Sequence, residues 1–187
     1  PRGGDFLYTD NELNILAEDI RQAVSLGVDG IVFGCLTSEG TIDYNAIKFL
    51  KEAAGTKSVT FHRAFDCCKD AWQAVEQLID LKIDRILTSG QESSGEKGVP
   101  LLHELQEQYG SRIKFLAGCG INESNIAQIY NQTGIKEYHF SAREKRGTDM
   151  KFFNRNVFMG NPDHDDYSFD VTSACKVQKT IKKLSNY

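Results

Sequence analysis

Short apolar runs recur along this chain at nearly constant spacing, and this period limits the folds that the sequence can adopt. Five runs, rich in β-branched and aromatic residues, begin near residues 29, 58, 85, 113 and 137. Successive runs are therefore 29, 27, 28 and 24 residues apart, and amphipathic helical patterns lie between them. A strand followed by a helix, repeated five times, predicts parallel strands joined by right-handed crossovers.

The helical patterns carry start and stop signals of their own. Thr9 and Glu12 have the spacing of a capping box ahead of the first pattern. Asp43 and Asp70 precede the second and third patterns, and Asn122 is predicted to cap the fifth. Glycines close four of the five patterns, namely Gly27, Gly55, Gly110 and Gly134.

Two architectures fit this order of elements, an open doubly wound sheet and a closed (β/α)8 barrel. The predicted strands are short, polar residues gather at their C-terminal ends, and the sequence has no dinucleotide-type GxGxxG motif. Polar residues at the end of every strand are typical of a barrel with one shared mouth. Five strands do not close such a barrel, and three further units would bring the chain to about 270 residues, near the ~250 typical of the fold. We therefore expect an α/β fold of the (β/α)8 TIM-barrel type that has five βα units and lacks the first three strands.

The C-terminal part of the chain has a different character. The βα period stops after Ala142, and Thr172 is predicted to cap a final helix that runs through Val177 and Ile181. We expect a single domain over residues 1–187, in which residues 143–187 form a helical tail. The final helix of this tail is expected to pack on the barrel or on a partner subunit.

Charge and hydropathy argue against several classes of partner. The 187 residues include 22 Lys and Arg against 26 Asp and Glu, a formal net charge of −4, so we expect neither nucleic-acid nor membrane binding. The mean hydropathy is −0.41, and no apolar run approaches the ~18 residues of a membrane helix. We expect no signal peptide ahead of Pro1 and, because the five cysteines contain no CxxC pair, we expect reduced thiols in a cytosolic protein.

One group of polar residues suggests acid–base chemistry on an anion. His62 and Arg63 are adjacent at the end of the second apolar run, and Asp66 follows three residues later. On a strand, His62 and Arg63 would point to opposite sides, whereas beyond its end both would turn into the loop. A neutral histidine beside an arginine and a carboxylate can combine acid–base catalysis with an anion clamp. The alternative is a structural Arg63–Asp66 pair with His62 as a packing residue.

Small residues follow the fourth and fifth runs, where many barrels bind phosphate. Gly118 and Gly120 flank Cys119 after the fourth run, and Ser141 follows the fifth. Backbone N–H groups and a helix N-terminus can receive an anion at such a place. The alternative is a tight turn that needs glycine for its backbone alone.

Four cysteines are candidate ligands for a soft metal, because thiolates suit Cu(I). They are Cys35, Cys67, Cys68 and Cys119. The neighbours Cys67 and Cys68 have poor chelate geometry unless another ligand joins them. Free cysteine also packs well in a core, so the spacing leaves both roles open.

Several long stretches of the chain closely resemble the CutC copper homeostasis family. In order, they read PRGGDFLYTD, DGIVFGCLTSEGTID, VTFHRAFD, DRILTSGQ, GCGINESNI and EYHFSAR. The resemblance implies a (β/α)8 barrel, a cytoplasmic or nuclear location, a homo-oligomer (dimer or tetramer), and a role in copper tolerance or trafficking through Cu(I). By position, the residues that match the family's strand-end motifs and would line the mouth are Arg2, His62, Arg63, Asp66, Ser89, Gly118, Gly120 and Ser141.

Three functions remain open from the sequence. The resemblance favours copper homeostasis, with Cu(I) as the metal and no organic cofactor. The strand-end residues favour an enzyme acting on a small anionic or phosphorylated metabolite, with Arg63 and the Gly118–Gly120 turn holding the anion and His62 or Asp66 moving a proton. A scaffold for assembly is the third. Copper homeostasis is our main hypothesis, with the enzyme as the alternative.

Overall fold

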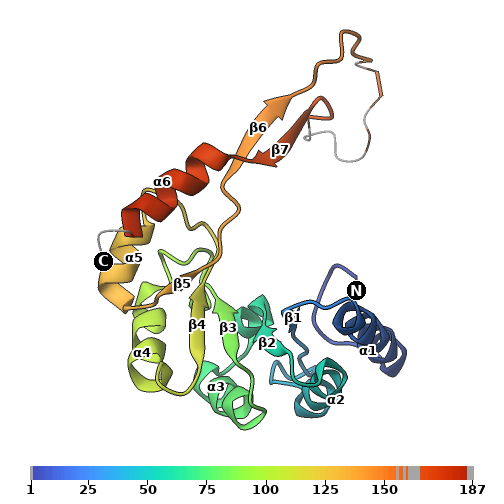
Figure 1. Ribbon diagram of the computed structural model, residues 1–187, viewed down its shortest axis with the longest axis vertical. Coiled ribbons are helices and arrows are strands. Elements are labelled where there is room, and N and C mark those ends of the chain that lie inside the picture. Colours follow the sequence, from blue (N-terminus) through green and yellow to red (C-terminus); the bar gives the residue numbers. More distant parts are fainter. Residues whose placement is uncertain (1, 155, 158, 160–164, 185–187) are drawn as a thin grey trace. The chain divides into compact units, whose positions relative to one another are not determined.

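The computed structural model describes residues 2–154, 156–157, 159 and 165–184. Strands and helices alternate along most of the chain (Figure 1). The strands of this part are β1 (Gly30–Phe33), β2 (Ser58–Phe61), β3 (Arg85–Thr88), β4 (Lys114–Ala117) and β5 (Glu137–Tyr138). The helices are α1 (Asp10–Ser25), α2 (Tyr44–Ala54), α3 (Ala71–Asp80), α4 (Val99–Tyr109) and α5 (Ile126–Thr133), with a 3₁₀ helix, η1 (Arg63–Cys67), directly after β2.

The five strands form one parallel sheet in the order β1-β2-β3-β4-β5. This order follows the chain without the reversal of a doubly wound sheet, and α1 to α4 follow an arc along one side of it (Figure 1). The predicted α/β fold of (β/α)8 TIM-barrel type is confirmed, with five parallel strands and a helix after each of the first four. The described strands leave two sheet edges, β1 and β5, so they do not close a barrel.

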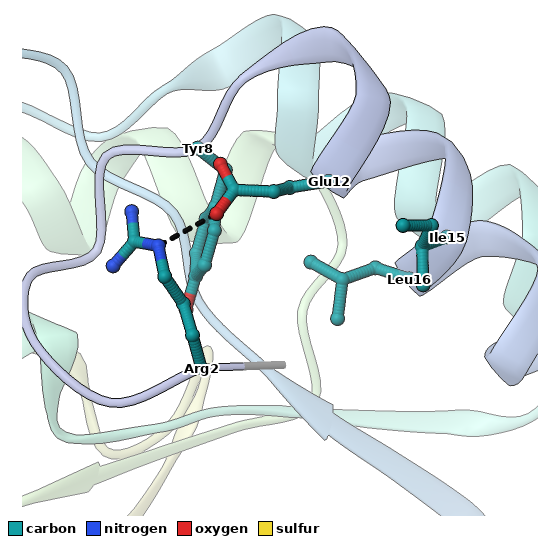
Figure 2. A pocket seen from close by; sticks show the side chains of 5 residues that line it. All are labelled: Arg2, Tyr8, Glu12, Ile15 and Leu16. Atoms are coloured by element: carbon teal, nitrogen blue, oxygen red, sulfur yellow. Dashed lines mark hydrogen bonds and ion pairs between the residues drawn. The ribbon is translucent and has the colours of Figure 1, made fainter.

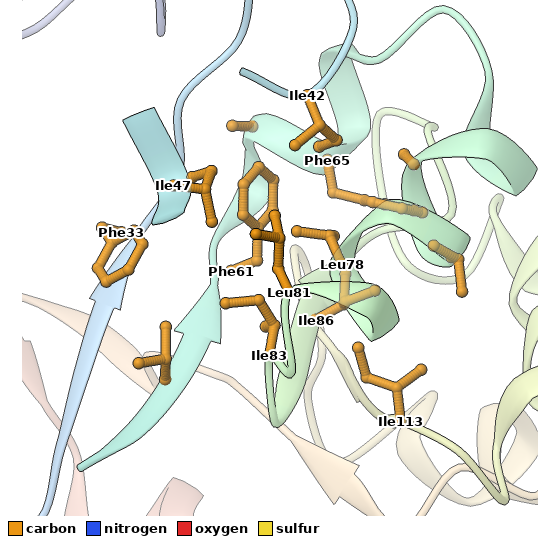
Figure 3. Packing of buried hydrophobic residues seen from close by; sticks show 14 of the residues in the cluster. Phe33, Ile42, Ile47, Phe61, Phe65, Leu78, Leu81, Ile83, Ile86 and Ile113 are labelled. Atoms are coloured by element: carbon orange, nitrogen blue, oxygen red, sulfur yellow. The ribbon is translucent and has the colours of Figure 1, made fainter. Parts of the chain in front are cut away.

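Aromatic and aliphatic side chains on the helix-facing side of the sheet build the core (Figure 3). Phe33, Phe61, Ile86 and Phe115 share one register row across β1 to β4, and none is more than 5% exposed. They pack with buried helix residues such as Ile47, Leu78 and Leu102. Burying side chains of this size is worth roughly 1.5–3 kcal/mol each, so this layer holds the sheet in place.

The next register row carries polar and charged groups. Val32, Thr60, Arg85 and Lys114 are aligned across β1 to β4. Arg85 forms an ion pair with Glu137 of β5, and the Lys114 ammonium lies 3.6 Å from the same carboxylate. Since successive residues of a strand point to opposite faces, this ladder lies on the face away from the core.

The helix starts agree with the sequence at the four predicted caps. Glu12 N–H donates to Thr9 Oγ1, and Thr9 N–H donates to the Glu12 carboxylate, as predicted. Asp43 and Asp70 cap α2 and α3. Asn122 also behaves as the predicted cap of the fifth helix, because its side chain accepts the N–H of Ser124 and its carbonyl accepts the N–H of Ile126, where α5 begins.

The chain divides into two compact units. The sheet unit comprises Pro1–Ile121 and Gln128–His139, and the second unit comprises Asn122–Ala127 and Phe140–Tyr187. The second unit contains an antiparallel pair, β6 (Arg143–Gly147) with β7 (Ser168–Thr172), followed by α6 (Ala174–Leu184).

The predicted final helix is therefore present as α6, but the strand pair before it was not predicted. Thr172 is the last residue of β7, and the Ser173 hydroxyl accepts the N–H of Lys176, so the predicted cap is displaced by one residue. The docking of α6 on the barrel or on a partner stays a prediction. Within the described ranges, no helix combines the length and apolar character that a membrane crossing needs.

Candidate functional site

The candidate site lies where β2, β3 and β4 end. β2 ends at Phe61, and His62 is the N-terminal cap of η1. Of the two alternatives for His62 and Arg63, the structure therefore shows the second, in which both residues lie beyond the strand. Ser89 follows β3, and Gly118 follows β4. Because the carboxyl ends of parallel strands share one edge, these residues belong to one region of the sheet unit.

Asp66 organises this region by accepting hydrogen bonds from two segments. Its side chain is 6% exposed and receives Arg63 Nε at 2.7 Å. From the β3 end it receives Thr88 Oγ1 at 2.6 Å, the Ser89 N–H at 3.0 Å and the Gln91 N–H at 3.2 Å. A carboxylate with its lone pairs occupied in this way is poorly placed to exchange a proton with a substrate. The expected proton-transfer role of Asp66 is not supported, and the structural Arg63–Asp66 pair is present.

Arg63 is held in position with part of its guanidinium still available. Nη2 donates to Ser89 Oγ at 3.1 Å, in addition to the Nε contact with Asp66. No described residue accepts from Nη1, and the side chain is 42% exposed. Ser89 itself is fully buried and also donates to the Glu92 carbonyl, so it positions Arg63 and does not face a ligand.

His62 is half-buried among apolar neighbours. Its Nδ1 accepts the N–H of Ala64 at 3.2 Å, and its ring lies 4.9 Å from the ring of Phe6 between centroids. Burial lowers the pKa of His62, although a hydrogen bond with its own backbone opposes this shift. The imidazole is therefore neutral at pH 7.

The loop between β3 and α4 packs tightly on itself and on η1. A Cβ placed on Gly98 would lie 1.8 Å from the Ser89 carbonyl oxygen, and one on Gly90 would lie 2.4 Å from the Gly98 oxygen. The Gln91 amide donates to the Cys68 carbonyl at 2.7 Å. Sequence reasoning missed this loop, although the glycines of SGQESSGEKG were a visible signal of close backbone approach.

The Gly118–Gly120 turn fits the backbone alternative better than the anion site. The Gly118 N–H donates to the Thr88 carbonyl, and a Cβ there would lie 2.6 Å from Leu87. Cys119 and Gly120 both have positive φ, at 69° and 75°. Ser141 lies in the second unit and is exposed.

The Arg2 guanidinium donates its hydrogen bonds to residues of the N-terminal segment and of α1, and no N–H remains for an anion. Nε donates to Glu12 at 2.6 Å, Nη2 to Asp5 and the Leu7 carbonyl, and Nη1 to the carbonyls of Gly3 and Asp5. Hydrogen bonds from the Thr9 backbone and then from Arg2 lower the pKa of Glu12 to about 2. The expected anion-binding role of Arg2 is therefore not supported.

A cavity of about 170 Å³ lies beside this arginine. Figure 2 shows Arg2 and Glu12 joined by their ion pair, with Tyr8, Ile15 and Leu16 completing the lining. Because every N–H of the Arg2 guanidinium is bonded within the chain, this cavity offers mainly an apolar surface.

The four candidate metal ligands do not form one cluster. Cys35 and Cys68 are buried, and burial raises the pKa of both thiols to about 12, so they keep their protons. Cys67 is exposed and Cys119 is partly exposed. The described part of the chain contains no group of three His, Cys, Asp or Glu side chains that could hold a metal ion.

Comparison with known proteins identifies the family. The model of the CutC family matches residues 1–144. The chain belongs to the CutC family. A CutC family protein of Bacteroides fragilis is 52% identical over all 187 residues and is covered over 74% of its own length. The copper homeostasis protein cutC homolog of Mus musculus is 44% identical over 179 residues, which are 95% of this chain and 66% of the mouse protein.

A solved CutC structure supports the fold assignment. The structure of CutC from Streptococcus agalactiae superposes with a TM-score of 0.71 at 38% identity, covering 74% of this chain and 68% of that chain. The resemblance of the strand-end stretches to the CutC family is thereby confirmed.

Proposed function

We propose that this CutC chain acts in copper homeostasis. The observation that carries the proposal is the family match over residues 1–144, together with 44% identity to a mouse protein named for copper homeostasis. All five cysteines are free, which supports a reducing compartment such as the cytoplasm or nucleus. Cells that lack the gene should lose viability at copper concentrations that wild-type cells tolerate, and re-expression should restore growth. Equal copper tolerance with and without the gene would refute this role.

Direct Cu(I) contact is proposed for the accessible thiols. A thiolate binds Cu(I), and the buried Cys35 and Cys68 resist losing their protons. The described residues contain no group of three potential ligands, so copper would be a cargo held by few contacts. Cys67 and Cys119 are the candidate ligands.

An anaerobic Cu(I) competition titration against a coloured chelator tests this assignment. Cys67→Ser and Cys119→Ser should each lower the amount of copper bound, whereas Cys175→Ser, at another exposed thiol, serves as the matched control. Failure of the wild-type chain to compete would exclude direct binding at these thiols and leave an indirect role in copper tolerance.

The family also suggests a homo-oligomer, which we propose as a dimer or tetramer. Sedimentation velocity of the purified chain measures this directly. A single monomeric species at all concentrations would contradict it.

A second candidate function is an enzyme acting on a small anionic metabolite at the strand ends. It is favoured by the Nη1 of Arg63, for which the described residues offer no acceptor, beside the neutral His62. A turnover screen with phosphate esters and carboxylates tests it, with Arg63→Gln as the inactive comparison. No turnover of any compound in the screen would reject this candidate.

A further inference from the structure

His62 offers one hydrogen-bond donor just beyond the C-terminal end of β2. Because Nδ1 accepts the Ala64 N–H, the proton of the neutral ring is on Nε2. Among the described residues, the only buried side-chain nitrogen or oxygen without a partner is Gln77 Oε1, and no described residue bonds to His62 Nε2. The Nε2–H therefore reaches solvent.

The orientation of this donor is fixed by packing. A Cβ on residue 34 would lie 2.6 Å from His62 Nδ1 and 2.7 Å from Cε1, so Gly34 leaves room for the ring and little more. The rings of Phe6 and Phe61 lie 4.9 and 6.0 Å from it. A ring enclosed in this way presents Nε2–H in one direction.

Arg63 offers a second fixed donor from the adjacent residue. Asp66 and Ser89 hold Nε and Nη2, and Nη1 has no acceptor among the described residues. The Asp66 carboxylate that orients the guanidinium is itself anchored by Thr88 and Gln91. Preorganised donors of this kind favour a ligand that brings acceptor oxygens.

We propose that His62 Nε2–H and Arg63 Nη1 form a two-donor site for an oxyanion, a carboxylate or phosphate group of a small ligand. In this site His62 is a neutral hydrogen-bond donor and not a general base, and Asp66 is a positioning residue. The charge of Arg63 also disfavours a cation at the same place. The proposal deepens the second candidate function and rests on it only for the identity of the site, because oxyanion binding does not require turnover.

Histidine nitrogen NMR on the full, ¹⁵N-labelled chain tests the proposal. At pH 7 the two-bond couplings of His62 should show the Nε2–H form. Sodium phosphate and sodium acetate, added separately at constant ionic strength with chloride as the blank, should shift the His62 signals saturably. His103, exposed on α4, serves as an internal reference that should not respond.

Two pairs of variants keep the result specific. Arg63→Gln should weaken the phosphate response at least tenfold, whereas Arg112→Gln, at an exposed arginine paired with Glu76, should leave it unchanged. For variants that lack the imidazole, saturation transfer to the acetate methyl group replaces the histidine signal. His62→Phe should lose this transfer, and His62→Gln, which keeps an N–H donor, should retain part of it.

A response to both anions, or to only one of them, supports the site and tells whether phosphate or carboxylate is preferred. His62 signals that respond to neither anion in the folded chain would overturn it, as would an unchanged response in Arg63→Gln or a proton on Nδ1. Oxyanion binding without turnover would reject the enzyme candidate and leave the site intact. If the chain binds phosphate but not Cu(I), the oxyanion site stands and direct copper binding is rejected.

Discussion

Asp66 joins η1 to the end of β3, and its removal should destabilise the whole sheet unit. In Asp66→Asn, an amide NH₂ would replace one acceptor oxygen among donors from Arg63, Thr88 and Ser89. We expect urea unfolding to show a loss of about 2–3 kcal/mol, because buried donors lose their partner. Asp29→Asn, at an exposed position just before β1, should change stability by less than about 0.5 kcal/mol. Equal midpoints for the two variants would contradict the anchoring role.

The close approach of Gly98 to Ser89 gives a second test at single-residue resolution. A Cβ 1.8 Å from a backbone oxygen forces the loop to move, so Gly98→Ala should cost about 3 kcal/mol. Gly147→Ala is the matched control, because a Cβ there meets nothing within 4 Å. Thermal unfolding followed by circular dichroism should show a large drop in Tm for the first variant only. A wild-type Tm in Gly98→Ala would mean that this loop packs more loosely than described.

His62 should make stability depend on pH. Its pKa in the folded chain lies below the ordinary value of 6.5, so the unfolded chain takes up the proton first as the pH falls. The free energy of unfolding should therefore be unaffected by this group above about pH 6.5 and decrease as the pH falls from there through the folded-state pKa. His62→Gln should flatten this part of the profile in urea titrations. An identical slope in wild type and His62→Gln would show that His62 is not buried in this way.

At the scale of elements, the sequence predicted what depends on local pattern and spacing. The apolar runs located all five strands of the sheet, and the Thr9–Glu12 spacing located the start of α1. The partners of Asp66 at the β3 end, Thr88, Ser89 and Gln91, lie 22 to 25 residues further along the chain, so no local pattern links them. Only the fold shows that this carboxylate is saturated and that one donor of Arg63 is left over.

The strand pair β6–β7 was missed because it lacks the usual strand pattern. β6 reads REKRG, with no apolar residue and every position exposed, so no alternation marks it as a strand. β7 alternates Phe169 and Val171 with polar residues, but it is only five residues long. β6 is held as a strand by cross-strand pairing, such as that of Lys145 with Asp170, which the sequence of β6 alone does not indicate.

A two-stranded sheet of this kind is marginal in water, which predicts fast amide exchange. Hydrogen exchange at the amides of β6 and β7 should be orders of magnitude faster than at those of β2 and β3, whose Val59, Phe61 and Ile86 are fully buried. Exchange monitored by NMR or mass spectrometry at neutral pH checks this. Equal protection in the two sheets would indicate that a partner stabilises β6–β7.

On the scale of the whole molecule, the copper role and the oxyanion site rest on different side chains of the same strand-end region. The copper role rests on family membership, whereas the described thiols are divided between buried, protonated groups and accessible ones. The oxyanion site rests on fixed N–H donors beside a cationic group. Arg63→Gln removes no thiol, so loss of oxyanion binding with copper binding retained in this variant would separate the two proposals in one set of samples.

Among the described strands, the unpaired edge at β1 predicts how copies of this chain associate. β1 pairs only with β2 among the described strands, and its Val32 is 60% exposed. An exposed apolar edge favours pairing with another chain, and a lysine there opposes it. Val32→Lys should therefore shift the sedimentation coefficient toward that of the monomer and remove its rise with protein concentration. Ile15→Lys, which replaces an equally exposed residue on α1, should not do so. If both lysines act alike, or if the wild-type chain shows no concentration dependence, association does not proceed through β1.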